Sequence, residues 1–279
     1  MVILVTGASG QLGQSIQFIA SNYADCKFIF ASSQDLDITN QEHVNHFFDT
    51  NKIDFCINAA AYTAVDKAET ETDKAVSINV LGPKNLAIAC QKNNVKLIHV
   101  STDFVFDGAS SKPYLETDAT NPLGVYGKTK LDGEQAVIDN MKEYFIIRTS
   151  WVYSQFGNNF RNTMLRLASE RDSLSIVSDQ IGSPTNAVDL AKALLSIVQS
   201  NSSKYGIYNF SNEGTASWYD FATEIFRINN VVIEVNPIPT EAFPTPAKRP
   251  KYSLLDKSKI KNTFGIEIKT WQESLLQTI

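Results

Sequence analysis

The sequence predicts an α/β protein with a Rossmann-type doubly wound parallel sheet and a smaller C-terminal substrate-binding lobe. Three observations support this fold class. Apolar, strand-like runs alternate with helix-like segments through residues 1–150, a glycine-rich turn directly follows the first run, and five of the nine prolines gather in residues 237–250. Strands that are apolar throughout and separated by helices are typical of a parallel sheet covered on both faces.

The predicted elements of the first half follow one another in strand–helix order. Apolar runs predict strands at residues 2–6, 27–31, 54–61, 96–101 and 144–149. Helical spacing of apolar residues predicts helices at residues 10–21, 74–90 and 127–140. The pair Gly82-Pro83 predicts an irregularity within the second of these helices, because proline lacks the N–H that a helix interior needs.

The pattern loosens after residue 150. We therefore expect a dinucleotide-binding domain at residues 1–150 and a substrate-binding lobe at residues 151–279. An amphipathic helix at 188–198 and a strand at 206–210 predict that the chain returns to the first domain near residues 186–211. The proline-rich segment 237–250 is incompatible with a regular helix or a central strand.

Composition excludes several functional classes. Of 279 residues, 43% are hydrophobic and 20% charged, as in an ordinary globular protein, and the net charge of -5 argues against a nucleic-acid partner. No apolar run reaches the roughly 18 residues of a membrane span, and the start lacks signal-peptide features, so we expect a cytoplasmic protein. The three cysteines and three histidines lack metal-ligand spacing, which predicts no metal site.

A glycine-rich turn joins the first predicted strand to the first predicted helix. It reads Gly7-Ala8-Ser9-Gly10-Gln11-Leu12-Gly13. Such glycines form a tight turn and let the backbone approach a pyrophosphate, which the N–H groups and dipole of the following helix then bind. The position between strand and helix makes this turn a strong prediction of dinucleotide binding.

The end of the second predicted strand bears on the choice of cofactor. An NAD-specific site usually has Asp or Glu there to bind the ribose 2′-hydroxyl. This strand ends in Ser32 and Ser33, and the first carboxylates, Asp35 and Asp37, come later. Serine hydroxyls can donate to a 2′-phosphate, although no arginine is adjacent. The sequence thus modestly favours NADPH, with NADH as a second usable cofactor, and Asp37-Ile38 is expected at the adenine pocket.

A catalytic constellation is indicated by Thr102, Tyr126 and Lys130. Tyr126 and Lys130 are four residues apart and share a helix face. A nearby ammonium group favours the phenolate and lowers a tyrosine pKa from its usual value near 10. Tyr126 is then expected to donate a proton to a carbonyl oxygen, which Thr102 also binds through its hydroxyl.

Five segments along the chain resemble the extended short-chain dehydrogenase/reductases and, within them, the family of dTDP-4-dehydrorhamnose reductases. The segments are Asn-Ala-Ala-Ala-Tyr-Thr-Ala-Val-Asp-Lys-Ala-Glu at 58–69, Ser-Thr-Asp-Phe-Val-Phe at 101–106, Val-Tyr-Gly-Lys-Thr-Lys at 125–130, Arg-Thr-Ser-Trp-Val-Tyr at 148–153 and Pro-Thr-Pro-Ala-Lys-Arg-Pro at 244–250. The resemblance implies NADPH-dependent reduction of the C4 carbonyl of dTDP-4-dehydro-6-deoxy-L-mannose to dTDP-L-rhamnose.

The resemblance also implies roles for individual residues. It makes Tyr126 the proton donor and Lys130 its partner. It places Thr102, Asp103 and Trp151 on the sugar. The implied cofactor contacts are Gly10, Gln11, Leu12, Asp37, Ile38, Ala61, Tyr62 and Thr63.

Elementary chemistry supports part of this assignment. The small side chains of Ala59, Ala60 and Ala61 at a strand end let adenosine or ribose lie close. The indole of Trp151 can cover an apolar sugar face. The guanidinium of Arg249 can bind a diphosphate through two hydrogen bonds.

Two alternatives remain, and one family property is in question. A nucleotide-sugar 4,6-dehydratase or epimerase shares the fold, but a dehydratase usually has Asp-Glu after the catalytic threonine, whereas Asp103-Phe104 follows here. A non-catalytic NADP-binding regulatory subunit, such as the β subunit of methionine adenosyltransferase, is disfavoured by the intact Thr102, Tyr126 and Lys130. Some family members form Mg²⁺-dependent dimers through first-helix glutamates, and the absence of a carboxylate at residues 14–17 puts Mg²⁺-linked dimerisation in doubt. The chain is expected to be a monomer or homodimer.

Overall fold

Six parallel strands form the central sheet in the computed structural model, which describes residues 1–278. The strands are β1 (Val2–Thr6), β2 (Lys27–Ala31), β3 (Phe55–Asn58), β4 (Lys96–Thr102), β5 (Tyr144–Thr149) and β10 (Gly206–Asn209). Their order is β10-β5-β4-β3-β1-β2, and every neighbouring pair is parallel. The predicted doubly wound parallel sheet is confirmed.

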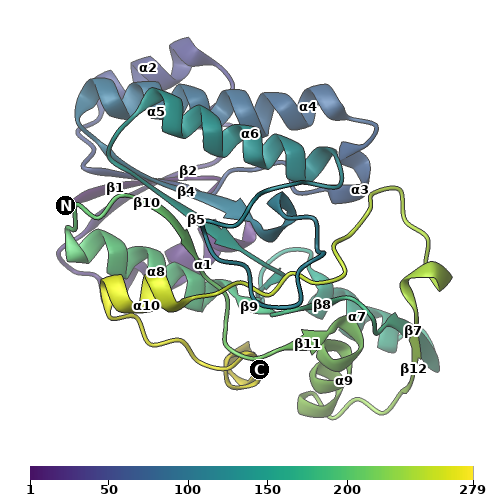
Figure 1. The fold of residues 1–279 in the computed structure, drawn as a ribbon. Coiled ribbons are helices and arrows are strands. Elements are labelled where there is room, and N and C mark those ends of the chain that lie inside the picture. The colour runs from purple at the N-terminus through teal and green to yellow at the C-terminus, as the bar shows by residue number, and fades with distance from the viewer. Residues whose placement is uncertain (279) are drawn as a thin grey trace.

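Helices cover both faces of this sheet (Figure 1). α2 (Gln41–Thr50), α5 (Gly82–Asn93) and α6 (Val125–Asn140) lie on one face, and α1 (Gln11–Ile19), α8 (Ala187–Ser200) and α10 (Ser258–Phe264) lie on the other. Successive strand residues point to opposite faces, so Ile3 and Val5 join the core under α1 and α8, whereas Leu4 joins the core under α5. This double burial explains why the strands are apolar throughout.

The helix predicted at 74–90 is interrupted by a π-helical turn. α4 (Thr72–Val76) leads into η2 (Ser77–Leu81), which leads into α5. The irregularity thus lies just before the Gly82-Pro83 pair, not at it. Pro83 has no N–H for the carbonyl of Asn79, its i−4 residue, so the regular hydrogen-bond ladder fails one turn earlier.

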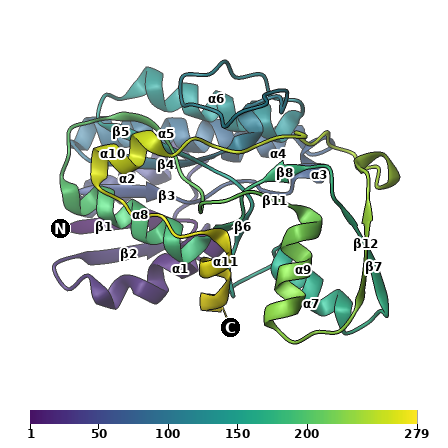
Figure 2. The ribbon, with the colours of Figure 1, turned by 60° about the horizontal axis from the view of Figure 1, so that its bottom comes forward.

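A second lobe lies beside the sheet (Figure 2). It contains α7 (Phe160–Ala168), α9 (Trp218–Ile228) and the paired strands β7 (Ser173–Val177) and β12 (Glu234–Ile238). Its core includes Tyr153, Phe221 and Trp271. The smaller elements are η1 (Ala20–Asn22), α3 (Val65–Ala68), η3 (Asp103–Val105), β6 (Val152–Tyr153), β8 (Ile181–Gly182), β9 (Thr185–Asn186), β11 (Ala216–Ser217), η4 (Thr240–Ala242), α11 (Trp271–Leu275) and η5 (Leu276–Thr278).

The chain passes from this lobe back to the central sheet. β10 forms the edge strand next to β5, with Gly206 opposite Phe145 and Asn209 opposite Arg148. Within residues 1–278, no helix combines the length and apolar character needed to cross a membrane. The division of the chain into two domains at residue 150 stays a prediction.

Candidate active site

The glycine turn has the geometry of a phosphate cradle. Gly7 has a left-handed backbone with φ +66, and a Cβ there would lie 2.6 Å from the amide nitrogen of Ala60, so only glycine fits. Gly10 precedes α1, and no side chain caps this helix end. The first-turn N–H groups therefore stay available to an anion, and this donor set suits a dinucleotide pyrophosphate.

The end of β2 differs from what its sequence suggested. Asp35 folds back, and its carboxylate accepts hydrogen bonds from the amide (2.9 Å) and hydroxyl (2.6 Å) of Ser32. These hydrogen bonds lower the pKa of Asp35, which therefore holds its negative charge near neutral pH. A carboxylate therefore lies at the end of β2, although the residues that follow the strand directly, Ser32 and Ser33, carry none. Asp37 accepts from the amide and hydroxyl of Thr39, and Ile38 is buried.

The other predicted cofactor residues gather where β1 and β3 end. Asn58 accepts from the amide of Ala60, and the amide of Tyr62 donates to Asn79 at 2.8 Å. Ala59, Ala60 and Ala61 are partly accessible, and Thr63 is exposed. Leu12 belongs to the core, so only its backbone can meet a cofactor, and Gln11 accepts from the hydroxyl of Ser154 at 3.2 Å.

Tyr126 reaches the strand edge because its helix comes very close to the loop after β4. A Cβ on Gly127 would lie 2.2 Å from the carbonyl oxygen of Phe104, so this approach requires glycine. Tyr126 packs edge-to-face on Phe104, with ring centroids 5.5 Å apart, and the amide of Phe104 donates to the hydroxyl of Thr102 at 3.2 Å. Thr102 also donates to Asp103 at 3.0 Å. The structure therefore brings Thr102 and Tyr126 together.

The pKa of Tyr126 shifts in the direction opposite to the one that its spacing from Lys130 predicted. Burial of its hydroxyl raises the pKa of Tyr126 to about 12. The ammonium group of Lys130 donates to the carbonyl of Val100 at 2.6 Å, and burial lowers the pKa of Lys130 to about 8. The expected lowering of the tyrosine pKa is absent, because removal from water dominates and the negative charge of Asp103 acts in the same direction. A tyrosine of high pKa keeps its proton at neutral pH, which is the form a proton donor needs.

Asp103 combines burial with an open acceptor. It is 2% exposed, and among the described residues its Oδ2 has no hydrogen-bond partner. Burial raises the pKa of Asp103 to about 6. A buried carboxylate oxygen without a partner is costly, which suggests that a bound hydroxyl group satisfies it.

Arg249 is already paired in this structure. Its guanidinium donates to both oxygens of Asp66, at 3.0 and 2.8 Å, and Asp66 also accepts from the amide of Ala247. This ion pair fastens the proline-rich segment onto α3. A diphosphate that binds Arg249 would therefore approach a guanidinium that already pairs with the carboxylate of Asp66.

Sequence reasoning missed several residues that position the site. Glu69 accepts from the amide of Val125 at 2.9 Å and so caps the helix of Tyr126. Asn79 donates to Thr129 on the same helix. Glu134 forms a buried ion pair with Arg148 at 2.7 Å. A signal was available for Glu134, which lies four residues beyond Lys130 on the same helix face.

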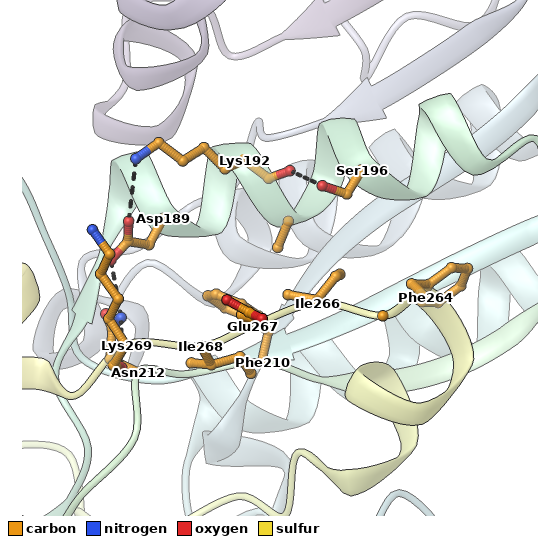
Figure 3. A pocket seen from close by; sticks show the side chains of 12 residues that line it. Asp189, Lys192, Ser196, Phe210, Asn212, Phe264, Ile266, Glu267, Ile268 and Lys269 are labelled. Carbon is orange, nitrogen blue, oxygen red and sulfur yellow. Dashed lines mark hydrogen bonds and ion pairs between the residues drawn. The ribbon is translucent and has the colours of Figure 1, made fainter.

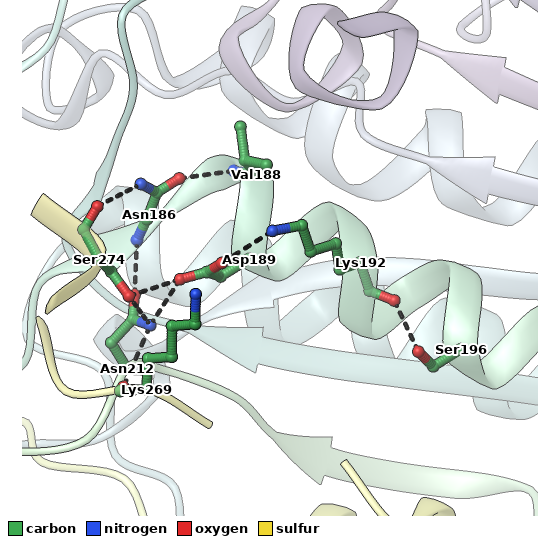
Figure 4. A network of polar contacts seen from close by, with 8 residues as sticks. All are labelled: Asn186, Val188, Asp189, Lys192, Ser196, Asn212, Lys269 and Ser274. Atoms are coloured by element: carbon green, nitrogen blue, oxygen red, sulfur yellow. Dashed lines mark hydrogen bonds and ion pairs between the residues drawn. The ribbon is translucent and has the colours of Figure 1, made fainter. Parts of the chain in front are cut away.

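A cavity of about 340 Å³ lies away from these residues, under α8 on the sheet face opposite α6 (Figure 3). Beside it, Asp189 accepts from Asn212 at 3.0 Å and from Ser274 at 2.5 Å, and Asn186 donates to the carbonyl of Ser274 (Figure 4). These polar groups satisfy one another and tie α11 to α8, which is a structural role. Across residues 1–278, no three His, Cys, Asp or Glu side chains gather as a metal site requires.

Comparisons with known proteins agree with this geometry. The family model "RmlD substrate binding domain" matches residues 1–279. The dTDP-4-dehydrorhamnose reductase of Aggregatibacter actinomycetemcomitans is 45% identical over 98% of this chain and 96% of its own length. The crystal structure of a Clostridium acetobutylicum dTDP-4-dehydrorhamnose reductase has a TM-score of 0.96 and 46% identity, covering 100% of this chain and 98% of that one.

A third relative was solved with a cofactor. The Bacillus anthracis dTDP-4-dehydrorhamnose reductase in complex with NADP has a TM-score of 0.95 and 40% identity, covering 99% of this chain and 98% of that one. Together with the glycine cradle and the paired Thr102 and Tyr126, these likenesses identify the chain. It belongs to the dTDP-4-dehydrorhamnose reductase family.

Proposed function

We propose that this protein reduces the C4 carbonyl of dTDP-4-dehydro-6-deoxy-L-mannose with NADPH and releases dTDP-L-rhamnose. The observation that carries the proposal is the placement of Thr102, at the end of β4, and of Tyr126, at the start of α6, beside the sheet edge that also bears the glycine cradle. A bound NADPH supplies the hydride for the carbonyl carbon. Gly7, Gly10, Gln11 and Gly13 would hold its pyrophosphate through the turn and the start of α1.

The chain's own residues then handle the oxygen and its proton. Tyr126 donates its phenolic proton to the carbonyl oxygen, and Thr102 orients that oxygen by donating a hydrogen bond. Lys130 contributes a positive charge near Tyr126 and would donate a hydrogen bond to the nicotinamide ribose. Asp103 accepts a hydrogen bond from a sugar hydroxyl. Phe104 packs on Tyr126 where a dehydratase needs a second acid, so elimination of water is disfavoured.

Finer properties belong to the same proposal. NADPH is the preferred cofactor and NADH a usable second one. The protein acts in the cytoplasm as a monomer or homodimer, and the lack of a carboxylate at residues 14–17 disfavours Mg²⁺-linked dimerisation. Residues 1–150 bind the dinucleotide, with residues 186–211 completing that domain, and residues 151–279 supply the substrate lobe, including Trp151 and Arg249. Ser32, Asp37, Ile38 and residues 59–63 line the adenosine half of the cofactor.

An absorbance assay tests the substrate assignment. The protein should oxidise NADPH at 340 nm with the nucleotide-linked 4-keto sugar and act far less efficiently on the free 4-keto sugar, because the diphosphate lends binding energy far from the reacting atom. Arg249→Ala should narrow that difference by weakening only the nucleotide-linked substrate. Equal efficiency with both sugars, or better efficiency with a simple aldehyde, would refute the nucleotide-sugar assignment.

A further inference from the structure

Trp151 has a backbone conformation that its residue type disfavours. Four non-glycine residues among 1–278 have positive φ, and three of them are Asn94, Asn201 and Asn230. Asparagine tolerates the left-handed region, whereas a bulky aromatic residue there is an outlier that its surroundings must enforce. The fourth is Trp151, with φ +46. Outliers of this kind gather at functional sites.

The indole of Trp151 is fixed by a second indole. Its ring stacks on that of Trp218, with centroids 3.5 Å apart and planes 6° from parallel. The backbone of Gly182 closes on the same ring, since a Cβ there would lie 2.6 Å from Cε2 of Trp151. The carbonyl of Trp151 accepts from the amide of Thr185 at 3.1 Å. The indole of Trp151 is therefore held by Trp218 and by the backbone of Gly182.

Trp218 is itself anchored within the second lobe. It is the first residue of α9, and its indole N–H donates to the side-chain oxygen of Gln180 at 3.1 Å. Gln180 is 5% exposed and donates in turn to the hydroxyl of Thr240. The ring of Phe160 packs against Trp218 at 4.6 Å. The plane of Trp218 is thus set by the lobe, and that plane sets the plane of Trp151.

Trp151 also has a fixed relationship to the catalytic threonine. Thr149, two residues earlier, ends β5 directly opposite Thr102 in the sheet register. Under the proposed function Trp151 covers an apolar face of the sugar, so a change in the plane of its indole would change how the sugar lies beside Thr102. Reaction rates depend steeply on such positioning.

We propose that Trp218 is a positioning residue for the sugar substrate, which holds the strained Trp151 indole in its productive plane. This inference rests on the proposed function and deepens it. It assigns to the second lobe a specificity-determining contact that reaches the sugar through another side chain. Trp218 acts on substrate binding and leaves the cofactor site untouched.

The test compares Trp218→Phe with Trp218→Leu. Phenylalanine keeps a flat ring for stacking, and leucine keeps only apolar bulk. We expect Trp218→Leu to raise the KM for the nucleotide-linked keto sugar about tenfold, equivalent to about 1.4 kcal/mol, with the KM for NADPH unchanged. Trp218→Phe should raise the sugar KM less than about threefold. Trp271→Phe is the matched control, because Trp271 is a buried tryptophan of the same lobe outside the stack.

Circular dichroism supplies an independent readout. Two indoles stacked this closely should give an exciton couplet, which both Trp218 variants lose and Trp271→Phe retains. A wild-type protein without the couplet would overturn the stacked geometry itself. Equal sugar KM values in the Leu and Phe variants, or equal increases for sugar and NADPH, would overturn the positioning role. An inactive wild-type protein that shows the couplet would instead refute the proposed function.

Discussion

The ammonium group of Lys130 donates a 2.6 Å hydrogen bond to the carbonyl oxygen of Val100, two residues before Thr102 on β4. This bond ties α6, the helix of Tyr126, to β4, the strand that carries Thr102. Lys130 is 2% exposed, and the carboxylate of Glu134 opposes the effect of burial on its charge. Because burial dominates, the pKa of Lys130 falls to about 8.

This pKa predicts an alkaline limit of activity. Lys130 is charged below about pH 8 and loses its proton above it, so kcat/KM should fall as pH rises through about 8. The other groups facing Lys130 do not titrate there, since His99 is held neutral by burial and the pKa of Tyr126 is about 12. A pH profile checks this. Lys130→Met should be slower and lack the alkaline limb, and a limb that survives in this variant would contradict the assignment.

Tyr126→Phe removes the donated proton and keeps the ring. We expect kcat to fall at least about 100-fold, the lower end of what a general acid contributes, while NADPH binding is unchanged. Steady-state kinetics and a fluorescence titration of NADPH measure the two effects. Tyr144→Phe removes a hydroxyl from the first residue of β5, at the end of the strand away from Thr102, and should leave kcat unchanged. Near-normal turnover of Tyr126→Phe would remove the tyrosine from its role.

Asp35 predicts how the cofactors are discriminated. Its carboxylate accepts from Ser32, which we propose lines the adenosine half of the cofactor, so its negative charge should oppose the 2′-phosphate of NADPH. Asp35→Asn should raise the ratio of kcat/KM for NADPH over NADH about fivefold, since a nearby unit charge in water is worth about 1 kcal/mol. Asp25→Asn removes an exposed charge at the other end of β2 and should not change the ratio. An unchanged ratio in Asp35→Asn would show that Asp35 lies outside the cofactor site.

The ion pair between Glu134 and Arg148 should contribute strongly to stability. Both side chains are at most 3% exposed, and Glu134 also accepts from Ser101. Glu134→Gln leaves the guanidinium without its charge partner and should lower the free energy of unfolding by about 3 kcal/mol. Asp132→Asn breaks the exposed Lys128–Asp132 pair on the same helix and should cost less than about 0.5 kcal/mol. Urea unfolding compares them, and similar losses would contradict the account.

The sequence predicted the sheet well because its strands are short apolar runs that end at polar residues or glycine. β1, β2 and β5 have the predicted boundaries. The predicted irregularity was placed too late, at Gly82-Pro83, whereas the π-helical turn lies at Ser77–Leu81. The missing N–H of Pro83 leaves the carbonyl four residues earlier without its helical partner. Segments of the second lobe, such as α7 and α9, were not predicted, since the loose pattern there hid their short amphipathic faces.

The site shows the same division between local and tertiary information. The spacing of Tyr126 and Lys130 is local, and the sequence therefore revealed it. Other contacts form only in the folded chain. They are the hydrogen bond of Asp35 with Ser32, the ion pair of Arg249 with Asp66 and the stacking of Trp218 on Trp151. The direction of the Tyr126 pKa shift depends on burial, which spacing alone does not contain.

Isotope transfer tests the central claim most directly. The protein is incubated with dTDP-4-dehydro-6-deoxy-L-mannose and NADPH that carries deuterium at both C4 positions of the nicotinamide, and the product is examined by NMR and mass spectrometry. The account predicts dTDP-L-rhamnose with a single deuterium at C4 of the sugar. A product without deuterium, or with deuterium at any other carbon, would contradict it.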